Sequence, residues 1–129
     1  MRKPAPGFTA AYADLIGKPF GWKGRGPDFF DCYGLVAEIE RRNGRQVPDF
    51  DSPVVMDKVH ACIAENTSLF QLCELGPGAI VVLRCGWHNS HIGIVLPFDK
   101  LLHTWERSGG VTCEPLDPWR RRIVGSYTY

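Results

Sequence analysis

One of the five cysteines has the sequence surroundings of a nucleophile. Cys32 follows Asp31, a residue type that commonly caps helices, so the pattern predicts that a helix begins at Cys32. The amino end of a helix carries partial positive charge, which favours the thiolate form of a cysteine. Gly34 is expected to leave room beside the sulfur for the backbone of a substrate. Cys32 is therefore the candidate nucleophile of a thiol enzyme.

A cysteine nucleophile needs a base, and two histidines twelve residues apart can supply the base and its partner. His91 begins an apolar, strand-like run, and His103 lies in the next such run, beyond a turn from Pro97 to Lys100. A hairpin centred on that turn would place position 94 opposite His103, so the two rings would be near each other but not directly opposite. His103 is then expected to accept a hydrogen bond from the far nitrogen of His91 and to fix its tautomer. Together with Cys32 they form a candidate catalytic triad.

The same part of the chain allows a metal site as an alternative. Cys85, His88 and His91 are spaced three residues apart, and thiolate and imidazole groups are ligands that zinc accepts. The spacing is not that of a common zinc knuckle, so the triad is the preferred interpretation. No metal or other cofactor is expected.

Helical spacing of apolar residues predicts three helices in the first half of the chain, separated by breaker-rich loops. The helix that begins at Cys32 places its apolar residues on one face and ends at Asn43-Gly44. The other predicted segments are an N-terminal helix capped by Thr9, with Tyr12, Leu15 and Ile16 on one face and a stop at Gly17; a weaker helix from about Val55 to Ala64; and loops from Gly17 to Pro27 and from Val47 to Pro53.

The second half of the chain reads as five short strands with turn signals between them. Short connections favour antiparallel pairing. The predicted strands are residues 79–83, 92–96, 101–105, 111–114 and 123–129. Helices followed by a meander predict one α+β domain over residues 1–129, with the nucleophile helix packed on an antiparallel sheet of about five or six strands.

Composition and charge exclude several classes of function. The formal net charge is only +1, which gives no indication of a nucleic-acid or anionic-membrane partner. The longest apolar runs are of strand length and too short to span a membrane. Residues 1–7 carry charge with no apolar segment behind them, so no secretory signal is predicted. An odd number of scattered cysteines argues against a disulfide framework and for synthesis in a reducing compartment.

Several short motifs, in the same order along the chain, resemble those of the NlpC-type cell-wall peptidase family. Gly17-Lys18-Pro19-Phe20-Gly21-Trp22 resembles the family's Gly-x-Pro-Tyr-x-Trp, and Phe30-Asp31-Cys32-Tyr33-Gly34-Leu35-Val36 resembles its Phe-Asp-Cys-Ser-Gly-Leu-Val. His91-Ile92-Gly93-Ile94-Val95-Leu96 is similar to its His-Val-Gly-Ile-Tyr-Leu strand, and Leu101-Leu102-His103 matches the site of its third catalytic residue. Lesser matches are Leu75 to Gly78, Trp119, Arg122 and Gly125, so the resemblance runs from about Tyr12 to Tyr129.

This resemblance implies a papain-like fold and a hydrolase that acts on the stem peptides of peptidoglycan, commonly at the bond between D-glutamate and the diamino acid. It implies Cys32, His91 and His103 as the catalytic triad, a thioester acyl-enzyme, and the Cys32 backbone N–H as an oxyanion donor. It also implies the residues that contact substrate: Tyr12, Phe20, Trp22, Asp31 and Tyr33.

Two of these positions depart from the family pattern. Phe20 replaces a tyrosine whose hydroxyl is thought to assist the oxyanion hole, and Tyr33 replaces a serine that helps to hold the end of the substrate in some members. The departures keep two alternatives open: a weak or inactive papain-like module that serves phage tail assembly or wall binding, and an acyltransferase with the same triad. Tyr33, a single domain and the lack of a signal peptide resemble phage tail-associated members. That resemblance implies synthesis in the bacterial cytoplasm, tail proteins as partners, and association with a virion.

Overall fold

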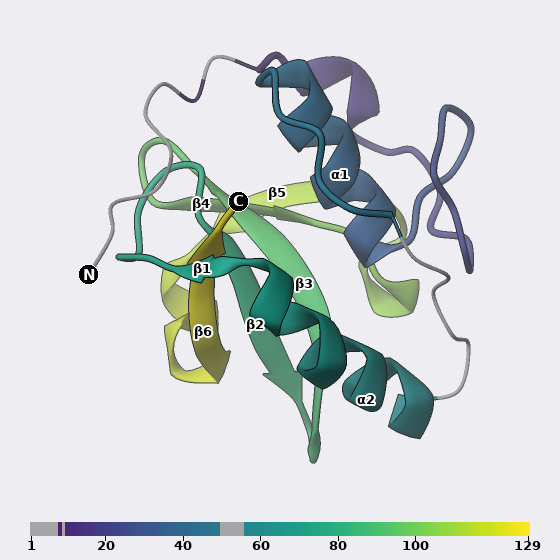
Figure 1. The fold of residues 1–129 in the computed structure, drawn as a ribbon. Helices are drawn as coiled ribbons and strands as arrows, with labels where there is room; N and C mark the ends of the chain where they lie inside the picture. The colour runs from purple at the N-terminus through teal and green to yellow at the C-terminus, as the bar shows by residue number, and fades with distance from the viewer. Residues whose placement is uncertain (1–7, 9, 50–55) are drawn as a thin grey trace.

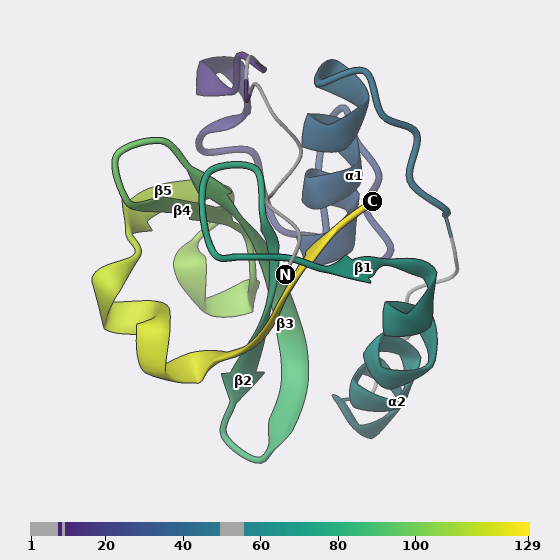
Figure 2. The ribbon, with the colours of Figure 1, turned by 60° about the vertical axis from the view of Figure 1, so that its left-hand side comes forward.

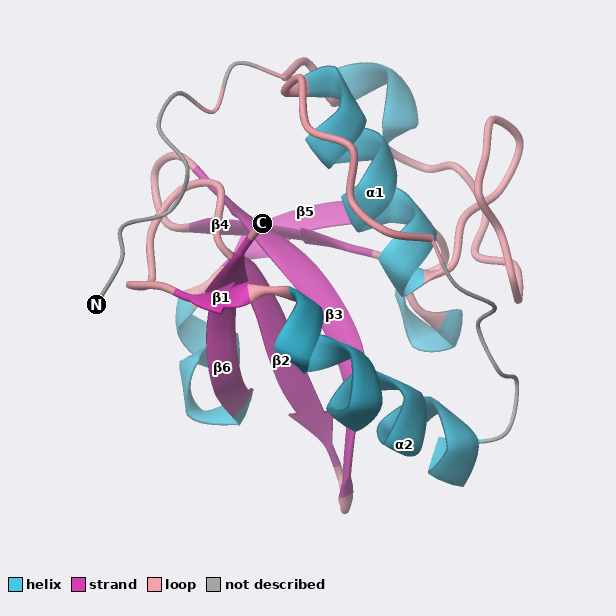
Figure 3. Cartoon of the chain, in the orientation of Figure 1, coloured by secondary structure: helices cyan, strands magenta, loops and turns pink. Residues whose placement is uncertain are grey.

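The computed structural model describes residue 8, residues 10–49 and residues 56–129, with residues 56–60 described by their backbone alone. Two α-helices accompany one six-stranded sheet in which every neighbouring pair of strands is antiparallel (Figure 1). The elements are α1 (Cys32–Arg42), α2 (Met56–Asn66), β1 (Gln71–Leu72), β2 (Ile80–Cys85), β3 (His88–Leu96), β4 (Lys100–His103), β5 (Thr112–Pro115) and β6 (Ile123–Thr128), and the strand order is β1-β6-β2-β3-β4-β5. The predicted α+β class, with helices ahead of an antiparallel sheet, is confirmed (Figure 3).

The sheet buries apolar side chains on both faces. Ile94 of β3 belongs to the cluster that packs with α1, whereas Val95 belongs to a second cluster on the opposite face. That second cluster includes Trp119 of the 3-10 helix Asp117–Arg122. Figure 2 shows α1 and α2 on one side of the sheet and this 3-10 helix on the other. Because neighbouring strand residues face opposite layers, the register of β3 decides which side chains reach each layer.

Helix α1 begins where the sequence predicts and holds Cys32 in its first turn. The Asp31 carboxylate caps the helix by accepting a hydrogen bond from the Gly34 N–H at 2.7 Å. The apolar face of the helix is fully buried in the core, through Leu35, Val36 and Ile39. The helix ends before Gly44, whose positive φ of 85° suits a glycine at that position. Capping and burial together fix the position of Cys32.

The glycine-rich segment ahead of α1 packs directly against that helix. Backbone hydrogen bonds run from Gly21 N to Phe30 O and from Asp31 N to Gly24 O, which fold the segment into a tight loop. A Cβ atom at Gly34 would lie 1.9 Å from the carbonyl oxygen of Gly24. The prediction that Gly34 leaves room for substrate backbone is therefore wrong, because the loop fills that space.

The β3–β4 hairpin differs by one residue from the predicted register. Gly93, rather than position 94, lies opposite His103, because Lys100 pairs with Leu96 and so belongs to β4 instead of the turn. The predicted register would have put His91 and His103 on opposite faces of the hairpin. In the observed register they are diagonal neighbours on one face, where side chains can touch.

The predicted N-terminal helix is much shorter than expected. Of its described residues, only Ala13–Leu15 is helical, as a 3-10 turn in which Leu15 is the buried residue. So little burial does not stabilise further helical turns. The predicted cap, Thr9, lies outside the described residues.

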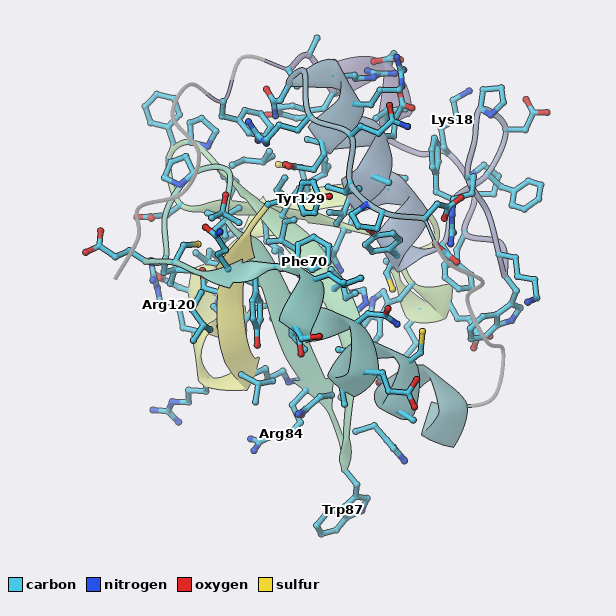
Figure 4. The ribbon with its side chains drawn as sticks, viewed as in Figure 1. Lys18, Phe70, Arg84, Trp87, Arg120 and Tyr129 are labelled. Carbon is cyan, nitrogen blue, oxygen red and sulfur yellow. The ribbon has the colours of Figure 1, made fainter. Side chains whose placement is uncertain are left out.

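Strand β1 was not predicted from the sequence. Its two residues are both exposed, so no alternation of apolar and polar residues marks it. It pairs with the end of β6, and the adjacent Phe70 ring packs on Tyr129 at 5.4 Å between centroids (Figure 4). The other predicted strands correspond to β2–β6 with ends that differ by up to four residues.

Helix α2 ends at Asn66, two residues beyond the predicted end, whereas the predicted start at Val55 lies outside the described residues. The predicted loop from Val47 is present as far as Asp49, and its remainder also lies outside them. In the described part of the chain, no helix combines the length and apolarity that a bilayer crossing needs.

Candidate active site

A cleft of about 430 Å³ is lined by the loop before α1, the start of α1, the β2–β3 hairpin and residues 104–107. Its lining includes six of the predicted site residues: Phe20, Trp22, Asp31, Cys32, Tyr33 and His91. His103 is buried beside His91, and Tyr12 is not part of the lining. At the hairpin tip, Trp87 extends away from the body of the molecule and is 95% exposed (Figure 4).

The Cys32 thiol lies at the start of α1, against the backbone of β3. Burial, followed by the neighbouring Asp31 carboxylate, raises the pKa of this thiol to about 12. The backbone N–H groups of Ile92, Tyr33 and Cys32 itself oppose the increase. The thiol form therefore predominates at rest, and burial outweighs the helix-end field that was expected to favour the thiolate.

His91 and His103 are in direct contact. Nε2 of His91 lies 2.8 Å from Nδ1 of His103, and both residues are buried. Gly93, which lies opposite His103, has no side chain that could separate the two rings. The Trp105 ring stacks on His91 with centroids 5.0 Å apart and further fixes the orientation of the imidazole. The predicted proximity of the two histidines is present, in the corrected register.

Two further residues complete this arrangement: Glu114, which was not identified from the sequence, and Trp119, which was named there only as a motif match. Oε1 of Glu114, on β5, lies 3.3 Å from Nε2 of His103. The indole N–H of Trp119 donates a hydrogen bond to the same carboxylate oxygen. The β4–β5 pairing places Leu101 opposite Glu114, so Glu114 shares a face with His103. A prediction of that pairing could have found Glu114.

Both imidazoles rest in the neutral form. Burial, followed by the proximity of His103 and then of Arg122, holds the pKa of His91 well below its usual value. Burial also lowers the pKa of His103, although the Glu114 carboxylate acts in the opposite direction. A neutral imidazole at His91 has a lone pair that can take a proton near neutral pH, as a general base must.

The predicted substrate-contact residues have different surroundings. Asp31 accepts from Arg25 at 2.8 Å through Oδ1, while its buried Oδ2 has no hydrogen-bond partner among the described residues. Tyr33 is buried, and its hydroxyl donates to the Pro48 carbonyl. The Tyr33 side chain thus ties the chain after α1 to the helix, and its hydroxyl is already engaged.

The aromatic positions ahead of α1 also separate into two groups. Phe20 and Trp22 line the cleft and pack edge to face, with centroids 5.1 Å apart. Tyr12 packs edge to face with Phe8 instead, with centroids 6.4 Å apart. Tyr12 is partly buried against the core and lies outside the cleft lining, so its contact with substrate stays a prediction.

The zinc alternative also lacks support. Cys85 and His88 line the same cleft as His91, but the described residues contain no group of three or more side chains placed to hold a metal ion. Nε2 of His91 is directed to His103 rather than to Cys85 or His88. The arrangement of thiol and paired imidazoles suits nucleophilic acyl transfer.

Comparison with known sequences relates the chain to one protein family and to proteins named as probable endopeptidases. The NlpC/P60 family matches residues 17–128. A protein of Listeria grayi named "Probable endopeptidase p60" is 24% identical over 123 residues, which are 92% of this chain and 22% of that protein. A "Probable endopeptidase" of Corynebacterium glutamicum is 28% identical over 102 residues, 79% of this chain and 43% of that protein. The chain thus spans about a fifth of the length of the Listeria protein and under half of the length of the Corynebacterium protein.

Solved structures share the fold at low sequence identity. NlpC2 from Trichomonas vaginalis matches 90% of this chain and 43% of its own, with a TM-score of 0.66 and 19% identity. The NlpC/p60 domain of the peptidoglycan hydrolase SagA matches 92% of both chains, with a TM-score of 0.61 and 17% identity. These similarities confirm the predicted papain-like architecture.

Proposed function

The chain belongs to the NlpC/P60 family, and from that membership we propose that it is a cysteine peptidase that hydrolyses an amide bond in the stem peptides of peptidoglycan. The observation that carries the proposal is the cleft in which Cys32, at the start of a helix, and His91, backed by His103, line one surface. Relatives named as endopeptidases and a neighbour titled a peptidoglycan hydrolase support the substrate class.

The proposed reaction begins from the neutral thiol and the neutral imidazole. His91 takes the thiol proton on Nδ1 as the Cys32 sulfur attacks the amide carbon, and the backbone N–H of Cys32 donates to the developing oxyanion. The imidazolium then gives its proton to the leaving amine, which leaves a thioester on Cys32. His91 next takes a proton from water, whose oxygen attacks the thioester and releases the carboxylic acid and the thiol.

For the bond, we propose the one between D-glutamate and the diamino acid. Asp31 supports recognition of a stem peptide with a free amino group, since it lines the cleft and its buried Oδ2 has no partner among the described residues. An ammonium group would satisfy such a carboxylate oxygen and remove the cost of leaving it unpaired. The association with a phage tail predicted from the sequence is not supported by the relatives above and stays a prediction.

Product analysis tests the proposal. Purified peptidoglycan is incubated with the protein and with Cys32→Ala in ¹⁸O-labelled water, and released peptides are identified by mass. We expect fragments that end in D-glutamate and carry ¹⁸O in the new carboxyl group, formed by the wild type alone. Incorporation of an added amine in place of ¹⁸O would indicate an acyltransferase, and unchanged peptidoglycan would favour the inactive module.

A further inference from the structure

The far side of the histidine pair is occupied by a carboxylate that the proposed reaction does not use. Nε2 of His103 is buried, and Oε1 of Glu114 lies 3.3 Å from it. The contact with Glu114 is a close ion-pair contact rather than a well-formed hydrogen bond, and this buried nitrogen has no hydrogen-bond partner among the described residues. The indole N–H of Trp119 donates to the same oxygen of Glu114, which fixes where that oxygen points. His91, His103 and Glu114 thus form a series of three side chains from the cleft to β5, and Trp119 holds its far end.

We propose that Glu114 is a positioning residue that sets the tautomers of both histidines, so that His91 presents an unprotonated Nδ1 to the cleft. The inference rests on the proposed function for its significance, but it concerns proton positions that can be observed without substrate.

The proton positions follow from the acceptors. A carboxylate oxygen can only accept, so the neutral His103 carries its proton on Nε2, facing Glu114. Nδ1 of His103 then has a lone pair and accepts from Nε2–H of His91 across the 2.8 Å contact. Because a neutral imidazole has one N–H, Nδ1 of His91 is left with a lone pair for the proton of Cys32.

Without Glu114, nothing on the far side of His103 would favour one tautomer of the two histidines over the other. His103 could then hold its proton on Nδ1 and donate it to His91, which would place the His91 proton on Nδ1, where it blocks the base. Other charged or titratable groups around the pair do not replace Glu114. Arg122 is a donor, and its charge lowers the pKa of His91, while Cys32 is itself the proton source.

Nitrogen-15 NMR of the histidine rings tests the proposal on the substrate-free protein. In the wild type we expect both His91 and His103 to carry their proton on Nε2. In Glu114→Ala we expect His103 to shift toward the Nδ1–H form, accompanied by His91. A wild-type His103 protonated on Nδ1, or identical tautomers in the wild type and Glu114→Ala, would overturn the proposal. If Glu114→Ala does not fold, the wild-type spectrum alone still decides.

Glu114→Gln separates geometry from charge. The indole N–H of Trp119 donates to Oε1 of Glu114. In Glu114→Gln the same donor should hold the amide oxygen at that place, facing His103. We therefore expect wild-type tautomers in Glu114→Gln, and ring titration at lower pH, because the carboxylate that raises the pKa of His103 is gone. Tautomers altered as much as in Glu114→Ala would contradict the acceptor role.

Kinetics provide the second readout. On a stem peptide, Glu114→Ala is expected to lower kcat about tenfold or more with KM nearly unchanged, and Glu114→Gln to recover most of that loss. Asp99→Asn is the matched control, since it removes a carboxylate paired with Arg120 at 3.4 Å, away from the cleft. A protein with the expected tautomers that cuts no peptidoglycan would refute the proposed function and leave this inference standing.

Discussion

Nε2 of His91 and Nδ1 of His103 lie 2.8 Å apart on one face of the β3–β4 hairpin. Only one of the two nitrogens can hold the shared proton when both rings are neutral, so the surroundings of one ring determine the tautomer of the other. The contact exists because Gly93 lies opposite His103 and leaves His91 as the diagonal neighbour. The strand register is therefore part of the catalytic arrangement.

Substitution of His103 should separate hydrogen bonding from packing. We expect His103→Ala to lower kcat by about a hundredfold or more, since His91 loses the acceptor that orients it. His103→Asn should retain more activity, because an amide oxygen can accept from Nε2–H of His91. Steady-state kinetics of the two variants test this, and their melting temperatures show whether both remain folded. Equal losses of kcat in the two variants would contradict an orienting role.

The pH dependence of Cys32 alkylation should reveal the neutral resting pair. Burial raises the pKa of the Cys32 thiol to about 12, and burial holds the pKa of His91 below its usual value, so no thiolate–imidazolium pair accumulates at low pH. The rate of iodoacetamide labelling at Cys32, followed by peptide mapping, should rise continuously from pH 6 to pH 9. A plateau of fast labelling below pH 7 would show that the ion pair is the resting form.

Phe20→Tyr tests whether the oxyanion site lacks a donor. Phe20 lines the cleft at the position of a tyrosine in the family pattern, and loss of one oxyanion donor typically costs about 10²–10³ in rate. We expect the new hydroxyl to raise kcat without lowering KM, since its hydrogen bond forms only in the transition state. An unchanged or lower kcat in a folded variant would mean that backbone groups already complete the site.

A buried ion pair should stabilise the helix that carries Cys32. Glu40 of α1 is 1% exposed and accepts from Arg45 at 2.7 and 3.0 Å. Arg45→Met leaves this carboxylate buried without its cation and should lower the free energy of unfolding by about 3 kcal/mol. Arg41→Met is the matched control, because Arg41 pairs with Glu38 at the surface and its loss should change little. Equal urea midpoints for the two variants would contradict this account.

The sequence predicts the parts of the fold that local chemistry determines. The Asp31 cap and the buried face of α1 give the helix and its start, so Cys32 is placed correctly. The β3–β4 register is missed because the sequence does not distinguish the predicted four-residue turn from the observed three-residue loop. That difference shifts the pairing of the two strands by one residue. The role of Gly34 is missed for a similar reason, since its contact with Gly24 depends on how a loop packs.

Other features of the site could not be predicted because they depend on contacts between residues that are far apart in the sequence. Glu114 has no motif of its own, and it reaches His103 only through the β4–β5 pairing. The engagement of Tyr33 with Pro48 joins positions fifteen residues apart through a loop. Burial of Cys32 reverses the thiolate preference that a helix end alone would give.

The central claim is covalent catalysis by Cys32, and trapping the acyl-enzyme tests it most directly. The protein is mixed with a soluble stem peptide, quenched with acid within the first turnover, and its mass and peptide map are recorded. We expect an added mass equal to the amino-terminal part of the peptide, located on Cys32, removed by hydroxylamine and absent in Cys32→Ala. Undiminished peptide cleavage by Cys32→Ala, with no adduct on the wild type, would contradict the account.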